Sequence, residues 1–111
     1  MKTGIEIIAD ERARQIEKEG WNAEHDDEHK YGELADAAAS YAMTDYMRRV
    51  IPKSPQDTSG KIPVTWPFGF EWWKETPDDR IKELAKAGAL IAAEIDRLLR
   101  LKELEDNLEE E

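Results

Sequence analysis

The sequence predicts an all-α fold, and three of its features support this class. Apolar residues recur every three or four positions through three long segments. No segment keeps the alternation of apolar and polar residues that is typical of a strand beyond a few positions. Helix caps, glycine and proline mark the ends of the three segments. We therefore expect a small helical bundle of two long helices and one shorter N-terminal helix, with a long aromatic-rich loop.

The shorter helix is expected from Thr3 to Glu19. Thr3 and Glu6 have the spacing of a capping box, in which hydroxyl and carboxylate satisfy free backbone N–H groups. Gly20 is suited to end the helix because it adopts left-handed backbone angles at no steric cost. One apolar stripe faces the expected core, and it is formed by Ile5, Ile8, Ala9, Ala13 and Ile16.

The second helix is expected from His29 or Tyr31 to Val50, after a polar loop over residues 21–30. Pro52 lies just beyond its end. The run ADAAAS would let a neighbouring helix approach closely. The core face of this helix is expected to consist of Tyr31, Leu34, Ala35, Ala38, Tyr41 and Ala42.

Residues 51–76 form a long connection that contains four prolines and two glycines. Its second half, VTWPFGFEWWK, holds three of the four tryptophans and both phenylalanines. Disordered segments are poor in aromatic residues. We therefore expect this half of the connection to pack onto the bundle.

The third helix has the clearest start in the chain. Thr76 suits the N-cap, Pro77 the first helical position, and two aspartates follow where the helix dipole favours negative charge. We expect residues 1–101 to form a single domain, with 102–111 as an acidic tail or an extension of this helix. The apolar face reaches at least Leu101 and contains Ile81, Leu84, Ala85, Gly88, Ile91, Ala92, Ile95 and Leu98.

The composition excludes several classes of protein. A chain of 111 residues is long enough for one modest core. It has no cysteine, which excludes a disulfide framework and fits a reducing cytoplasm. No apolar run approaches the roughly 20 residues of a membrane span, so we expect no membrane partner. The net charge of -10 argues against general nucleic-acid binding, but one small phosphorylated ligand remains compatible.

Carboxylates on two of the expected helices suggest a divalent-metal site. Glu33 and Asp36 are three residues apart in GELADAA and point to similar sides of a helix. On the third helix, Glu83 and Glu94 lie about three turns apart. Facing helices that carry carboxylates can hold magnesium or manganese. The alternative is that these acids only surround the core with solvent-facing charge.

The segment EHDDEH holds both histidines of the chain. His25 and His29 have the spacing of a metal pair if this stretch is helical, but no cysteine or third histidine is present to complete a zinc site. In the alternative, Asp26 or Asp27 caps the second helix. A histidine would then contact a ligand or the aromatic loop.

Tryptophans beside basic residues suggest a nucleotide site in the aromatic segment. Trp72 and Trp73 would stack on a purine ring, while Lys74 or Arg80 would meet phosphate. The alternative is that the aromatic residues only close a thin core.

The order of short motifs resembles a group of small phage and prophage proteins. The motifs are ERARQ, EGW, HDDEH, GELADAA, WPFGFEWWK and KAGALIAAEIDRLLR, which together span roughly residues 10–100. More distantly, the layout resembles the MazG-like all-α nucleotide pyrophosphohydrolases, which use magnesium to split nucleoside triphosphates. The resemblance implies a homo-oligomer that completes the bundle. It also implies a cytoplasmic location, in the host cytoplasm if the chain is phage-encoded.

Carried over to this chain, the resemblance gives Glu33, Asp36 and Glu83 as ligands of Mg²⁺. The chain departs from the family pattern at Lys86, where the family has a carboxylate, and at Gly32, where a glutamate is missing. A lysine at this position favours binding of phosphate over hydrolysis. The resemblance assigns no catalytic residue.

Two functions therefore stand as hypotheses. One is a MazG-like, magnesium-dependent pyrophosphohydrolase that acts on a nucleoside triphosphate or a related nucleotide. The other is a non-enzymatic phage protein that sequesters a small nucleotide, for example a host immune signal, or inhibits a host protein. The residues expected to contact the ligand are Trp21, His25, Asp26, His29, Trp72, Trp73, Lys74, Arg80 and Lys86.

Overall fold

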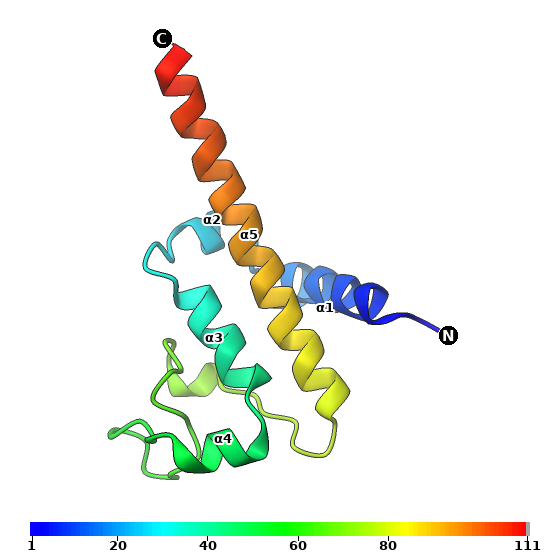
Figure 1. Cartoon of the computed structure of the whole chain (residues 1–111), viewed down its shortest axis with the longest axis vertical. Helices are drawn as coiled ribbons and strands as arrows, with labels where there is room; N and C mark the ends of the chain where they lie inside the picture. The colour runs from blue at the N-terminus through cyan, green and yellow to red at the C-terminus, as the bar shows by residue number, and fades with distance from the viewer. Residues whose placement is uncertain (111) are drawn as a thin grey trace.

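The computed structural model describes residues 1–110, and it confirms an all-α fold with no strand in that range (Figure 1). None of its helices combines the length and apolar character that a membrane crossing requires, within these same residues. A single 3-10 turn, η1, lies in the aromatic segment (Phe70–Trp72). The α-helices are α1 (Gly4–Glu19), α2 (Ala23–Asp27), α3 (Glu33–Ala42), α4 (Asp45–Val50) and α5 (Arg80–Glu110).

The bounds of α1 confirm the sequence-based expectation. The Thr3 hydroxyl accepts a hydrogen bond from the backbone N–H of Glu6, and the Glu6 carboxylate accepts one from the backbone N–H of Thr3. At the other end, Gly20 has φ 73 and closes the helix in the left-handed conformation. Local capping chemistry thus determines both ends.

The second expected helix is broken in two, which corrects the prediction of one helix to Val50. α3 ends at Ala42, and the Thr44 hydroxyl caps the new helix α4 by accepting from the N–H of Met47. Two arginines stabilise the break. Arg48 donates to the carbonyls of Ser40 and Tyr41. Arg80 donates to carbonyls of residues 41–43, so the free carbonyl groups at the end of α3 are satisfied.

The expected polar loop over residues 21–30 contains a short helix, α2, with Asn22 as its N-cap. Neither Asp26 nor Asp27 caps α3, contrary to the expectation, because Gly32 precedes that helix without a side-chain cap. Asp26 is fully buried and pairs with Arg12 at 3.0 Å. Asp27 instead pairs with Arg100 of α5.

The last helix begins three residues later than its caps suggest. The carboxylate of Asp79, rather than the hydroxyl of Thr76, accepts a hydrogen bond from the first helical turn, at the N–H of Lys82. Residues 76–79 form a turn in which Asp79 N–H donates to the Thr76 carbonyl. From there α5 continues to Glu110, so the acidic segment from 102 to 110 is an extension of the helix.

The core is small and rich in alanine. Of the 17 leucine and isoleucine residues in the chain, only Leu34, Ile62 and Leu90 are buried. The rest of the buried cluster is aromatic or small: Trp21, Ala37, Ala38, Tyr41, Trp66, Ala87 and Ala93. The aromatic segment packs onto this cluster through Phe68, Phe70 and Trp73, which confirms that expectation.

The apolar faces predicted for the first and the third expected helix are largely wrong as core faces, and the face of the second is half right. α5 turns another side toward α3, the side that carries Glu83, Lys86 and Leu90. α1 buries Glu11 and Gln15 instead of its isoleucine stripe. On the second expected helix, Leu34, Ala38 and Tyr41 are buried as predicted. Tyr31, Ala35 and Ala42 are exposed, contrary to the prediction. An amphipathic pattern shows that a face needs a partner, but it does not show which partner covers it.

The shape of the chain is open for its length. The N-terminal end of α1 points away from α3 and α4, and the C-terminal part of α5 extends beyond the other helices (Figure 1). The radius of gyration is 15.5 Å, whereas a compact chain of this length has about 13 Å. Two arms of the molecule therefore lack neighbours in a single copy.

Candidate functional site

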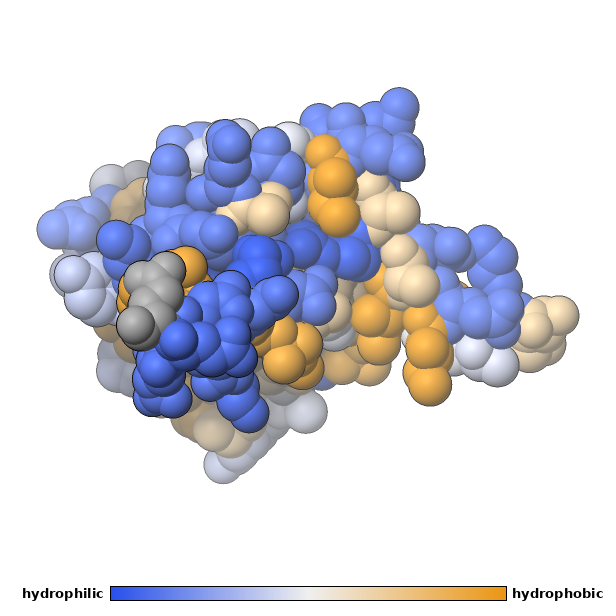
Figure 2. Space-filling model, turned by 90° about the horizontal axis from the view of Figure 1, so that it is seen from above, coloured by the Kyte–Doolittle hydropathy of each residue, from blue (hydrophilic) through white to orange (hydrophobic). Residues whose placement is uncertain are grey.

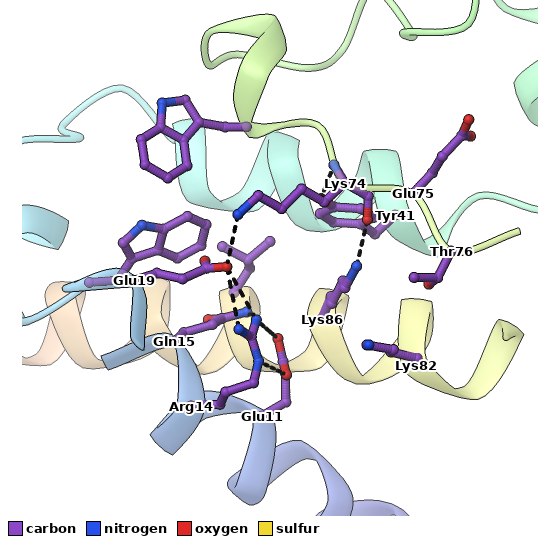
Figure 3. Close-up of a pocket in the computed structure, with 13 residues that line it drawn as sticks. Glu11, Arg14, Gln15, Glu19, Tyr41, Lys74, Glu75, Thr76, Lys82 and Lys86 are labelled. Atoms are coloured by element: carbon purple, nitrogen blue, oxygen red, sulfur yellow. Dashed lines mark hydrogen bonds and ion pairs between the residues drawn. The ribbon is translucent and has the colours of Figure 1, made fainter. Parts of the chain in front are cut away.

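A basic cavity of about 290 Å³ lies where α1, α5 and residues 72–76 meet (Figure 3). Four cationic side chains line it: Arg14, Lys74, Lys82 and Lys86. We call this site the basic cavity. Its other lining residues are Glu11, Gln15, Glu19, Trp21, Tyr41, Trp72, Glu75, Thr76 and Leu90.

Lys86 is the most deeply placed cation of the basic cavity. Only 7% of it is exposed, since it lies on the side of α5 that faces α3. Its Nζ donates to the carbonyl of Lys74 and lies 5.3 Å from the centre of the Tyr41 ring. Burial lowers the pKa of Lys86, and the nearby charge of Lys82 lowers it further. The ammonium group is thus held in a site that disfavours its own charge.

Lys82 and Lys86 also lack the carboxylate partners that the other two cations have. Among residues 1–110, neither lysine forms an ion pair. They lie one turn apart on α5, so their ammonium groups share one side of the cavity. The carboxylates of Glu11 and Glu83 act on Lys86 only from a distance, so two adjacent cations without a direct ion-pair partner line one side of the cavity in a chain whose net charge is -10.

Two of the three acids that line the basic cavity, Glu11 and Glu19, are paired with Arg14 and Lys74, whereas Glu75 forms no ion pair within residues 1–110. Arg14 binds Glu11 through two nitrogen atoms, at 2.7 and 2.8 Å, and approaches Glu19 at 3.4 Å. Lys74 Nζ lies 3.5 Å from Glu19. Burial opposes ionisation of Glu11, but hydrogen bonds and charge from Arg14 outweigh it and lower its pKa. Figure 3 shows these side chains linked in a row, from Lys74 through Glu19 and Arg14 to Glu11, at one side of the cavity.

Two buried polar atoms of the lining have no hydrogen-bond partner among the described residues. Gln15 is 2% exposed, and its Nε2 donates to Glu11, but its Oε1 is unpaired. The Thr76 hydroxyl is unpaired as well. A buried polar atom without a partner costs about 1–3 kcal/mol. A ligand with a hydroxyl or amino group would supply the donor that Gln15 Oε1 needs.

An aromatic cavity of about 410 Å³ adjoins the basic one and shares Glu19, Trp21 and Trp72 with it. Trp21 stacks on His25, with ring centres 5.4 Å apart and planes 6° apart. His29 contacts Phe68 of the aromatic segment. A contact between a histidine and this segment was one of two expected from the sequence, the other being a contact with a ligand. The lining is completed by Glu28 and Gly69. We call this second site the aromatic cavity.

Comparisons with protein-family models, curated proteins and solved structures find no match to this chain. What the chain binds is therefore inferred from the chemistry of the two adjoining cavities.

The structure does not bring together the three carboxylates expected to bind Mg²⁺. Glu33 lies at the start of α3, where its carboxylate accepts from the backbone N–H of Tyr31, whereas Asp36 is exposed. Glu83 lies beside the opposite end of α3, paired with Arg48 at 3.2 Å. Across residues 1–110, no group of three or more histidine or acidic residues is arranged to hold a metal ion. These residues therefore do not fit a bound magnesium ion.

Six of the nine residues expected to contact a ligand line the two cavities: Trp21, His25, His29, Trp72, Lys74 and Lys86. The other three have structural contacts elsewhere. Asp26 is buried against Arg12, and Trp73 stacks on Tyr41 with ring centres 4.8 Å apart. Arg80 binds the carbonyl groups at the end of α3.

Sequence-based reasoning missed Arg14, Gln15 and Lys82. A signal for the first two was present, because Glu11, Gln15 and Glu19 recur every four residues and form a polar stripe on α1. That stripe faces α5 and one side of the basic cavity. The isoleucine stripe of the same helix predicts a different buried face, so this polar side is not expected to be the buried one.

Proposed function

We propose that this chain is a binding protein for a small nucleotide and that it holds the ligand without a divalent metal. The observation that carries the proposal is the pair Lys82 and Lys86, two cations without carboxylate partners beside a cavity. An anion would supply the direct ion-pair partner that both lysines lack. Hydrogen bonds between ammonium groups and phosphate oxygens are among the stronger ones in proteins.

The aromatic cavity supports a nucleotide over a bare phosphate ion. Trp21 and Trp72 line both cavities, so a ligand with phosphate near Lys86 would place a ring beside the indoles. Base–aromatic stacking contributes about 1–3 kcal/mol per base in nucleic-acid complexes. The unpaired Gln15 Oε1 offers an acceptor for a ligand hydroxyl or amino group.

The carboxylates favour binding over hydrolysis. A magnesium-dependent pyrophosphohydrolase needs acids that are free to bind the metal. Glu83 is committed to Arg48 and to the backbone N–H of Thr76, and Glu33 is held by Tyr31 and His29. The distant resemblance to MazG-like proteins would then reflect a shared helical layout without the metal chemistry. The same proposal includes that the chain is a phage protein that sequesters the nucleotide. It also includes that the chain acts as a homo-oligomer.

A nucleotide panel tests this function. The chain is heated with nucleoside mono-, di- and triphosphates in EDTA and, separately, in magnesium, and pyrophosphate release is followed in parallel. We expect at least one nucleotide to raise the unfolding temperature in EDTA, because a ligand at 100 times its Kd adds about 2.7 kcal/mol to folding. No pyrophosphate should appear.

Two outcomes would contradict the proposal. Magnesium-dependent release of pyrophosphate that is abolished by Glu33→Gln would establish the hydrolase instead. An unchanged unfolding temperature with every nucleotide would show that the cavities do not bind this class of ligand.

A further inference from the structure

Apolar surface of two kinds occurs in this molecule. Apolar residues reach the surface between the projecting end of α5 and the arm formed by α1 (Figure 2). None of the exposed isoleucine and leucine residues of these two helices lines the basic or the aromatic cavity. The apolar part of the aromatic cavity consists instead of Trp21, Phe68 and Trp72, next to two histidines and two glutamates. The hydrogen-bonding groups of this mixed lining restrict the ring that the cavity can hold.

The aromatic cavity presents mostly hydrogen-bond acceptors. The carboxylates of Glu19 and Glu28 can only accept. No lysine, arginine, amide or hydroxyl side chain belongs to the lining, so the indole N–H groups of Trp21 and Trp72 are its only donors besides the histidines. The tautomers of the histidines therefore decide whether the cavity offers a ring further donors or further acceptors.

The buried carboxylate of Asp26 fixes the tautomer of His25. Asp26 is fully buried, and one of its oxygen atoms pairs with the guanidinium group of Arg12 at 3.0 Å. Its other oxygen lies 2.9 Å from Nδ1 of His25. A carboxylate in an ion pair accepts hydrogen bonds and has none to donate, so Nδ1 carries the hydrogen. In the neutral imidazole Nε2 is then left as an acceptor.

The ring of His25 is held in place with this acceptor within reach of a ligand. It stacks on Trp21, with the two planes 6° apart, and its side chain is 30% exposed. The two nitrogen atoms lie on opposite edges of an imidazole, so an Nδ1 that points to buried Asp26 leaves Nε2 on the other edge. Asp26 is the only hydrogen-bond partner of the ring within residues 1–110. His29 repeats the pattern, since its Nδ1 lies 3.5 Å from the Glu33 carboxylate.

We propose that the ligand is an adenine nucleotide and that His25 is the residue that selects the base, by accepting a hydrogen bond at Nε2 from its 6-amino group. This specificity rests on the proposed function, because it requires the ring of a nucleotide in the aromatic cavity. Adenine is the common base that has an exocyclic amino group and no carbonyl oxygen. The carbonyl oxygens of the other bases are acceptors, and the carboxylates of Glu19 and Glu28 disfavour them in this cavity.

Titration of the natural chain with ATP and with purine riboside triphosphate, in EDTA, tests this selection. The second ligand differs from ATP only in having a hydrogen in place of the 6-amino group. At about pH 8, above the ordinary titration range of histidine, we expect ATP to bind about 10-fold more tightly, because the analogue cannot make one hydrogen bond. GTP should also bind more weakly than ATP.

The outcomes separate this specificity from nucleotide binding itself. Equal affinities of ATP and the analogue, or tighter binding of GTP than of ATP, would overturn the selection of adenine and leave nucleotide binding intact. If no nucleotide binds at all, the proposed function fails and the specificity fails with it.

The variant His25→Phe locates the selection in one side chain. Phenylalanine keeps an aromatic ring against Trp21 and removes both nitrogen atoms. The affinity for ATP should fall about 10-fold, whereas that for purine riboside triphosphate should not change. Lys82→Gln is the matched control, and it should weaken both ligands equally because Lys82 lines the basic cavity, where phosphate is expected. Circular dichroism checks that the helices remain in each variant. A preference for ATP that persists in His25→Phe would overturn the role of His25.

The tautomer of His25 can be measured in the natural chain, so this test does not depend on the folding of a variant. Long-range proton–nitrogen NMR spectra distinguish a protonated from an unprotonated ring nitrogen. We expect a hydrogen on Nδ1 and none on Nε2, and an Nε2 signal that shifts with ATP but not with the analogue. A hydrogen on Nε2 in the complex with ATP, or an Nε2 signal that ATP leaves unchanged, would contradict the proposed contact.

Discussion

At the scale of single residues, the account depends on a buried lysine without an acidic partner. In the sequence, Lys86 stands at a position where the resembled family has a carboxylate. The structure places it beside Lys82 in the basic cavity. The sequence could not reveal that Lys86 would be buried, because its burial depends on α3 and on residues 72–76, which contact α5 only in the folded chain.

The lowered pKa of Lys86 predicts how nucleotide affinity changes with pH. Burial and the charge of Lys82 place this pKa below the ordinary value of lysine. As pH rises through the lowered value, Lys86 loses its charge and the attraction for phosphate falls. Affinity should therefore decline in alkaline solution before ordinary lysines titrate. Titrations of nucleotide at stepwise increasing pH, up to the ordinary lysine value of about 10.4, measure this decline.

The variant Lys86→Arg is the control for this pH dependence. A guanidinium group stays charged throughout the range, so its affinity should be nearly constant where that of the natural chain falls. Identical pH profiles for the two proteins would show that Lys86 does not carry the charge that holds the ligand.

At the scale of helices, local signals predicted where most helices lie, but not how they pack. The capping box at Thr3 and the glycine at position 20 gave both ends of α1 correctly, because caps involve neighbours in sequence. The break between α3 and α4 was missed because it is stabilised by Arg80, which is distant in sequence. The pattern on α5 predicts a continuous apolar face, but its isoleucine and leucine side chains lie exposed and do not form the core.

The crossing of α1 and α5 predicts the effect of adding one methyl group. A Cβ at Gly88 would lie 2.6 Å from the Ile8 side chain, and β-branched Ile8 has little freedom to move. Gly88→Ala should therefore lower the free energy of unfolding by about 1–2 kcal/mol, despite the higher helix propensity of alanine. In an Ile8→Ala background the same substitution should become stabilising. Urea unfolding of the four proteins measures both effects, and a stabilising Gly88→Ala in the natural chain would contradict this packing.

At the scale of the whole molecule, charge and apolar surface are segregated. The chain is acidic overall, with a net charge of -10, yet four cations line one cavity. The leucine and isoleucine residues lie mostly outside the core. The core is therefore built mainly from alanine and aromatic residues, although the long helices are amphipathic.

The measurement that tests the central claim most directly is calorimetric titration of a nucleoside triphosphate into the full chain in EDTA. Lys82→Gln is compared with Lys102→Gln, since both lysines are exposed on α5 and only Lys82 lines the basic cavity. We predict one binding site per chain in the absence of metal. The affinity of Lys82→Gln should be about 10-fold weaker, because one charge-assisted hydrogen bond is lost. The affinity of Lys102→Gln should not change. Binding only in the presence of magnesium, or equal affinities of the two variants, would contradict the account.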